Sequence, residues 1–170
     1  TGTSGAVVVA IVGALQTLQG LPINAGDLAR AAHAVETERL GQQSGVQDQW
    51  AAACGGINDV EISRYPDATV TRIAVPDRWR DHLESHLLLV YLGRSHSSSA
   101  VHEAVIRDVL NAGPARAALD DLRAVAAAAR DAVMACDVTA LGQAMRDNTA
   151  AQRRLHPSLV GTDADRVVTV

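Results

Sequence analysis

The chain contains no lysine and no phenylalanine among its 170 residues, so every basic side chain is an arginine. Without lysine, a phosphate-binding loop of the G-x-x-x-x-G-K-[ST] type cannot exist in this sequence. Cysteine is scarce as well. Cys54 and Cys136 lie far apart and in no metal-ligand spacing, which favours a reduced, cytoplasmic setting over a disulfide framework. These absences leave other routes to phosphate binding open.

The composition that remains is that of an ordinary globular protein. Hydrophobic residues make up 48% of the chain and the formal net charge is −4, so we expect a substantial core and no nucleic-acid partner. The apolar run from Ala6 to Leu15 is too short to span a bilayer and follows no basic leader. It therefore predicts neither a membrane anchor nor a signal peptide.

The hydrophobic pattern predicts a mixture of helices and strands. Residues 6–15 are apolar on every side, which is typical of a buried helix. Residues 57–75 alternate around a Tyr65-Pro66-Asp67 turn, which predicts a hairpin. The run 87–92 is continuously apolar and predicts a strand buried on both faces. Further helices are expected over 24–40, 77–85 with Trp79 and Leu83 inward, 101–110, 115–135 and 138–155.

The first helix begins in small and hydroxylated residues, Gly2-Thr3-Ser4-Gly5. A helix that starts in such a turn presents unpaired backbone N–H groups and the positive end of its dipole, so it can hold phosphate oxygens without any lysine. The alternative is that Thr3 or Ser4 is a simple N-cap, as in any protein.

Three acidic residues surround a turn further along the chain. Glu36 and Glu38 fall in the last turn of the helix predicted over 24–40, and Asp48 lies twelve residues after Glu36. Acid at a helix C-terminus is unfavourable to the dipole, so a nearby cation would explain it better than helix propensity does. Two alternatives stay open: the two glutamates could be solvated beside Arg39, and Asp48 could be an N-cap.

Two segments carry a resemblance to a known family. Gly2-Thr3-Ser4-Gly5-Ala6 matches the tail of the phosphate loop of the GHMP small-molecule kinases, and the run from Gln47 to Asn58, QDQWAAACGGIN, is similar to their acid-bearing segment in the sugar-phosphate branch. The resemblance implies an α+β, two-domain GHMP kinase fold, incomplete at both ends. Residues 1–84 would belong to an S5-like nucleotide-binding domain and residues 85–170 to a ferredoxin-like domain with extra helices.

The resemblance also implies roles for individual residues. Asp48 would be the general base, and Glu36 and Ser4 would bind Mg²⁺, with Glu38 close enough to exchange roles with Glu36. The spacing between Glu36 and Asp48 agrees with that in galactokinase-like members. The phosphate loop that wraps ATP would comprise Gly2, Thr3, Ser4 and Gly5.

A second turn would help to form the substrate pocket. Family members commonly carry an arginine two or three places after a glycine here, whereas in this chain Arg94 directly follows Gly93 and His96 stands where that arginine is expected. Arg94, His96 and Ser97 are the candidate substrate residues. The alternative for Ser97–Ser99 is that they only cap the next helix.

Two more histidines, His82 and His86, have metal-like spacing but no third ligand at a recognisable distance along the chain. They are therefore expected to face solvent rather than bind a metal. Solvated faces are also expected for the runs Asp120-Asp121 and Arg153-Arg154.

The predicted function is that of an ATP- and magnesium-dependent sugar or sugar-phosphate kinase, acting as a cytoplasmic enzyme, with a homodimer as one option for its assembly. The likeness to the sugar-phosphate branch implies the anomeric hydroxyl of a heptose phosphate as one acceptor. The first alternative is a non-catalytic relative that binds a sugar or ATP as a sensor. The second is a scaffold domain in which every polar feature is a helix cap.

Overall fold

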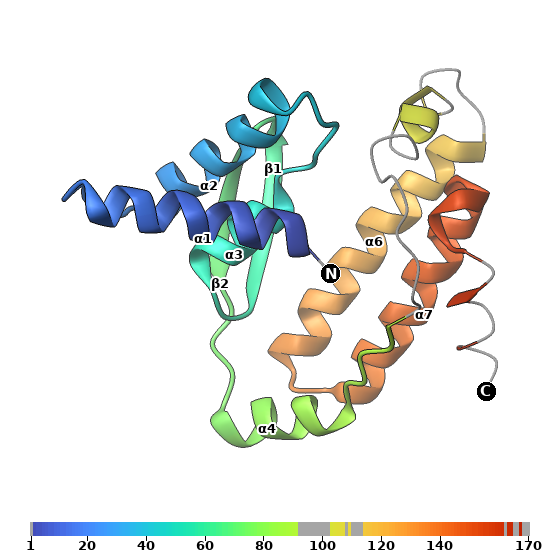
Figure 1. Cartoon of the computed structure of the whole chain (residues 1–170). Helices are drawn as coiled ribbons and strands as arrows, with labels where there is room; N and C mark the ends of the chain where they lie inside the picture. Colours follow the sequence, from blue (N-terminus) through green and yellow to red (C-terminus); the bar gives the residue numbers. More distant parts are fainter. Residues whose placement is uncertain are drawn as a thin grey trace. The chain divides into compact units, whose positions relative to one another are not determined.

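The computed structural model describes residues 2–91, 103–107, 109, 114–161, 163–164 and 167 (Figure 1). The chain divides into two compact units, Thr1–Ile73 and Ala74–Val170. The division comes before α4 (Asp77–His86), whereas the predicted domain boundary after residue 84 falls inside that helix. The boundary between an S5-like and a ferredoxin-like domain, which the resemblance implies, stays a prediction.

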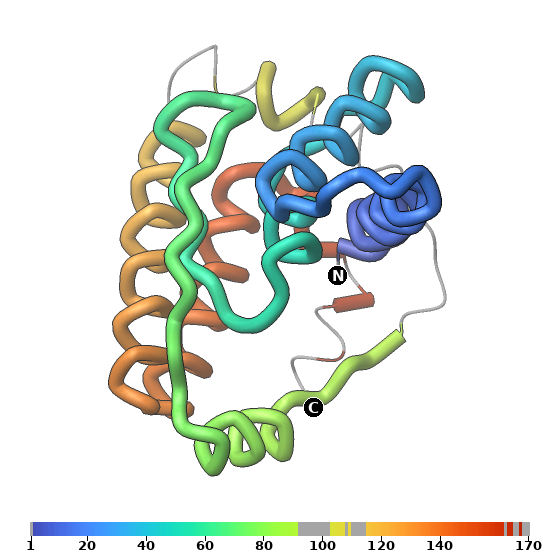
Figure 2. The backbone as a smooth tube through the Cα atoms, turned by 90° about the vertical axis from the view of Figure 1, so that its left-hand side faces the viewer, coloured from blue at the N-terminus to red at the C-terminus, as the bar shows by residue number. Residues whose placement is uncertain are grey.

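The first unit packs three helices with a two-stranded hairpin. Its elements in chain order are α1 (Thr3–Leu18), α2 (Ala25–Ala34), the π-helical turn η1 (Val35–Arg39), α3 (Gln47–Cys54), β1 (Asn58–Arg64) and β2 (Asp67–Arg72). The helices α1, α2 and α3 contact one another, and α3 also contacts β1 (Figures 1 and 2). The strands pair antiparallel with Val60 opposite Val70, so the predicted hairpin is confirmed.

Two small apolar clusters hold this unit together. Val9, Leu28 and Ala32 join α1 to α2, and Ala29, Val46 and Trp50 join α2 to α3. Val60 and Val70 of the hairpin pack against the second cluster, as does the partly buried Cys54. Cys54 therefore lies in a packing position.

The burial predicted for the first helix is wrong for most of its length. The helix forms, but Gly5 and Val9 are its only buried residues, and Val7, Ile11 and Leu15 are each more than half exposed. Apolar composition indicates which surroundings a side chain tolerates, whereas burial depends on what packs against it. In the first unit only the side of α1 that faces α2 and α3 is covered.

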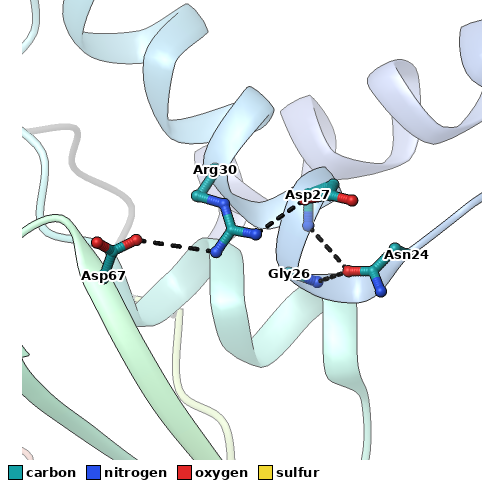
Figure 3. A network of polar contacts seen from close by, with 5 residues as sticks. All are labelled: Asn24, Gly26, Asp27, Arg30 and Asp67. Atoms are coloured by element: carbon teal, nitrogen blue, oxygen red, sulfur yellow. Dashed lines mark hydrogen bonds and ion pairs between the residues drawn. The ribbon is translucent and has the colours of Figure 1, made fainter.

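The start of α2 is held by polar contacts at the surface (Figure 3). Asn24 Oδ1 accepts hydrogen bonds from the backbone N–H groups of Gly26 and Asp27, at 2.9 and 3.1 Å. Arg30 pairs with Asp27 at 2.8 Å and reaches Asp67 of β2 at 3.8 Å. These groups are exposed, so they orient the helix more than they stabilise it.

All the regular structure in the described part of the second unit is helical. It contains α4, helical residues 103–107, α6 (Pro114–Met134), α7 (Val138–Leu155) and the 3₁₀ turn η2 (Pro157–Leu159). Helices α6 and α7 contact each other, and most of their fully buried residues are alanines, namely Ala118, Ala132, Ala144 and Ala151. Small side chains allow the helices to approach closely. The predicted helices over 77–85, 115–135 and 138–155 are confirmed within a residue or so at either end.

The strand predicted over 87–92 is wrong for residues 87–91, which have no regular structure. Leu88, Leu89 and Tyr91 are almost fully exposed. A strand needs a neighbour to satisfy its backbone groups, and none of the described residues of the second unit forms one. Helix and strand together agree with the α+β class, while the S5-like and ferredoxin-like domains stay predictions.

The helices in the described part of the chain are all too short or too polar to serve as a bilayer span.

Candidate active site

The candidate phosphate loop forms the beginning of α1. Gly2 is the N-cap, with φ 61° and ψ 21°, and no side chain caps the helix. The first intrahelical bond runs from Ala6 N–H to Gly2 C=O at 2.9 Å, so Thr3, Ser4 and Gly5 occupy the first turn. The alternative in which Thr3 or Ser4 is the N-cap is therefore wrong. Ser4 is exposed at this helix start, where anions are favoured.

Asp48 lies directly against this helix start. A Cβ atom added to Gly2 would lie 3.0 Å from Asp48 Cγ and 3.2 Å from Asp48 Oδ1, and one added to Gly5 would lie 3.1 Å from Asp48 Cβ. Gly2 also has the positive φ that disfavours other residues. The two glycines thus permit the close approach of α1 and α3, and the fold brings together the predicted base and the predicted phosphate loop.

Asp48 is an exposed residue in the first turn of α3. The N-cap of that helix is Val46, and no side chain caps it. The alternative that Asp48 is an N-cap is therefore wrong. An exposed carboxylate beside a helix start is accessible to a ligand bound there.

Glu36, in contrast, points into the unit and is only 2% exposed. Its Oε2 accepts a hydrogen bond from Ser44 Oγ at 3.0 Å and another from Gln49 Nε2. The solvated alternative is therefore wrong for Glu36, whereas Glu38 and Arg39 are exposed. Burying a carboxylate is costly unless hydrogen-bond donors satisfy it, and Ser44 and Gln49 are the donors that offset this cost for Glu36.

The helical turn that contains Glu36 is wider than the α-helical turn that was predicted. The helix expected over 24–40 is α-helical only to Ala34, and a π-helical turn follows, in which Leu40 N–H bonds to Val35 C=O at 3.1 Å. Single π-helical turns inside helices are frequent at functional sites. Hydrophobic periodicity does not distinguish such a turn from an α-helical one, which is why the sequence did not indicate it.

Gln49 connects the acid to the start of α1. It is 1% exposed, and its Cδ lies 3.5 Å from the position of a Cβ on Gly5. Its Nε2 donates to Glu36 and also to Ser44 Oγ at 3.1 Å, while its Oε1 has no hydrogen-bond partner among the described residues. Gln47 and Gln49 flank Asp48 on either side along the chain. The structure separates them, because Gln47 is exposed.

His33 and Tyr65 form a pair beside the acids that the sequence did not indicate. His33 Nε2 and Tyr65 Oη are 2.7 Å apart, with the rings edge to face at 5.4 Å. Burial lowers the pKa of His33, against the opposing effects of the Glu36 and Glu38 carboxylates and the Gly45 backbone. The neutral form is thereby favoured. Their separation of 32 residues explains why no local pattern revealed the pair.

The predicted metal ligands suit magnesium that arrives with phosphate. No group of three or more histidines, cysteines, aspartates or glutamates that could hold a metal occurs among the described residues. Mg²⁺ usually binds one or two carboxylates plus substrate phosphates rather than a complete protein cage. Glu36 supplies a carboxylate whose Oε1 is not hydrogen-bonded within the described part of the chain, and Ser4 supplies an exposed hydroxyl. The residues thus fit the ion, and their role as ligands stays a prediction.

The other histidines follow the sequence prediction. His82 and His86 are both exposed on α4, with ring centroids 4.2 Å apart, and His86 Nδ1 bonds to the His82 carbonyl at 2.8 Å. Their expected exposure to solvent is confirmed. The candidate substrate residues Arg94, His96 and Ser97 lie outside the described residues.

Comparison with known proteins points to the same region. Residues 1–56 match the family model described as the GHMP kinases N terminal domain. The chain is also similar to D-glycero-alpha-D-manno-heptose 7-phosphate kinase of Campylobacter jejuni, at 28% identity over 102 residues, which are 60% of this chain and 30% of that protein. The chain thus spans less than a third of this curated relative. Together these matches confirm the predicted resemblance: residues 1–56 match the N-terminal domain of the GHMP kinases, and the chain is similar to one heptose-phosphate kinase.

Proposed function

We propose that the protein is a kinase that transfers the γ-phosphate of ATP to a hydroxyl group of a sugar or sugar phosphate. The family model over residues 1–56 and the similarity to a heptose 7-phosphate kinase support this reaction class. The name of that relative makes a heptose 7-phosphate the first acceptor to test, and the resemblance predicts its anomeric hydroxyl as the position phosphorylated.

One observation carries the proposal: Asp48 lies at the open start of α1. With a Cβ on Gly2 only 3.0 Å from Asp48 Cγ, a phosphate held by the first-turn amides would have this carboxylate beside it. Phosphoryl transfer needs an oriented acceptor, a group that takes its proton and dipoles that neutralise the phosphate charge. Asp48 would take the proton of the sugar hydroxyl, and Gly2, Thr3, Ser4 and Gly5 would cradle the phosphates.

Glu36 and Ser4 would hold the magnesium ion. Bound magnesium neutralises charge on the transferring phosphoryl group. The chain contributes a carboxylate fixed by Ser44 and Gln49 and a hydroxyl in the first turn of α1. The two acids differ in their surroundings, since Glu36 is buried and Asp48 exposed, and this difference supports separate roles for them.

The test is substrate-dependent ADP release by the full-length protein with magnesium and ATP, over a panel of hexoses, heptoses and their phosphates. We expect Asp48→Asn to lower kcat by ~10²-fold or more, the usual contribution of a positioned general base. ATP affinity and Tm should hardly change, because Asp48 is exposed and makes no hydrogen bond among the described residues. Asp67→Asn, an equally conservative change at an exposed aspartate of β2, is the matched control.

Each outcome has a definite meaning. Undiminished turnover in Asp48→Asn would remove this residue from the mechanism. ATP and sugar binding by the wild type without turnover would favour the sensor alternative. Failure to bind ATP with magnesium at all would favour the scaffold alternative.

A further inference from the structure

The hydrogen bonds of Glu36 are one-sided. Ser44 Oγ and Gln49 Nε2 both donate to the same oxygen, Oε2, and no hydrogen bond to Oε1 is found among the described residues. An ionised carboxylate can accept about four hydrogen bonds over its two oxygens. A purely structural role would be served best by donors on both, so the arrangement leaves one oxygen for another partner.

The available protons agree with this arrangement. The Gln49 amide has two N–H groups, and they reach Glu36 Oε2 and Ser44 Oγ. Ser44 has one hydroxyl proton, which can go to Glu36 Oε2 or to the Gly45 carbonyl, each at 3.0 Å. The charged carboxylate is the stronger acceptor. The opposite orientation of the amide would place Gln49 Oε1 against Glu36, which is unfavourable.

Gln49 also determines where this carboxylate lies relative to the phosphate loop. Its Cδ is 3.5 Å from the position of a Cβ on Gly5, and Asp48, the residue before it, contacts the same turn. A single buried amide therefore contacts the first turn of α1 and the carboxylate of η1 together. Gln49 thereby links the carboxylate of Glu36 to the first turn of α1.

We propose that Gln49 and Ser44 are positioning residues that hold Glu36 Oε2, so that Oε1 is directed at a divalent cation accompanying the nucleotide phosphates. This inference rests on the proposed function. Residues that orient a metal ligand typically account for a factor of ~10 to 100 in metal affinity or activity. The two donors differ from the predicted ligands in that neither would touch the cation.

The experiment measures Mn²⁺ binding to the full-length protein in the presence of a non-hydrolysable ATP analogue, using the electron paramagnetic resonance signal of free Mn²⁺. Gln49→Ala and Ser44→Ala are each expected to raise the Kd for Mn²⁺ by ~10-fold or more. Ser44→Thr keeps the hydroxyl and should restore most of the affinity. Gln43→Ala removes an exposed glutamine of the same loop and is the matched control.

A second measurement separates positioning from a general loss of structure. A merely structural role would lower Tm by the same amount with and without Mn²⁺ and nucleotide. Positioning predicts that the increase in Tm caused by Mn²⁺, at saturating nucleotide, shrinks in Gln49→Ala and not in Gln43→Ala. An unchanged Mn²⁺ affinity in folded Gln49→Ala and Ser44→Ala would overturn the inference alone. Absence of Mn²⁺ and nucleotide binding in the wild type would overturn the proposed function instead.

Discussion

The two units differ in whether they bury polar side chains. The first buries Glu36, Gln49 and His33, which are the only buried polar or charged residues in the described part of the chain. The second keeps its charges at the surface, as in the pair between Arg154 and Asp121 at 2.8 Å, whose side chains are 55% and 53% exposed. Burial of polar groups is costly, so groups that are buried despite this cost are the better candidates for function.

The helix starts show a related contrast. Asn24 caps α2 through Gly26 and Asp27, and Asp137 caps α7 by accepting from Ala140 N–H at 2.9 Å. The starts of α1, α3 and α4 have no side-chain cap. At α1 and α3 the open starts coincide with the glycine contacts around Asp48. A helix start without a side-chain cap does not by itself indicate a ligand. Two such starts that lie next to the same acid, Asp48, support a ligand site there.

The largest effect on stability is expected in the first unit. Trp50 joins α2, α3 and the hairpin in one cluster, so Trp50→Ala should lower the free energy of unfolding by ~3 to 5 kcal/mol. Tyr91→Ala, at an almost fully exposed aromatic residue of the second unit, should change it by no more than ~0.5 kcal/mol. Denaturant unfolding followed by circular dichroism gives both values. Similar losses in the two variants would show that the first unit does not depend on this cluster.

An intermediate effect is expected from acid. The pKa of His33 in the folded chain lies below its ordinary value because the residue is buried, so the unfolded chain binds the proton more readily. The stability that this residue contributes is present above the ordinary histidine pKa and is lost as the pH falls through it. Wild-type Tm should therefore fall from pH 7.5 to pH 5.5 by more than that of His33→Gln.

The control for this titration is His82→Gln, at an exposed histidine of the second unit. It should keep the pH dependence of the wild type. If His33→Gln and His82→Gln lose stability with acid to the same extent, His33 is not the group responsible.

The smallest effect is expected at the surface of the second unit. Arg154→Ala removes the ion pair with Asp121, which links α7 to α6, and should cost at most ~1 kcal/mol because both side chains are solvated. The loss should shrink further in 1 M salt, where exposed charges are screened. A larger loss that persists at high salt would mean that this ion pair of the second unit is not screened by solvent as the surface pairs are.

Much of the local structure follows from the sequence. Helices α6 and α7 lie close to the predicted ranges 115–135 and 138–155. Helix α6 begins at Pro114 and α7 begins after the capping Asp137, because proline and a capping aspartate act on the residues next to them. The hairpin follows from alternation around Tyr65 and Pro66. The phosphate-loop segment Gly2–Gly5 and the segment that contains Asp48 were likewise recognisable, because each of them is a short run of consecutive residues. These features depend on short-range chemistry.

Tertiary structure alone decided which of these residues meet. The one-sided covering of α1 and the exposure of residues 87–91 depend on what packs beside them, which no local pattern contains. The burial of Glu36 rather than Glu38 depends on a π-helical turn, and the contact of Gln49 with both Glu36 and α1 depends on how α3 crosses two other elements. A sequence specifies the chemical preference of each side chain, but burial and partnership are properties of groups distant along the chain.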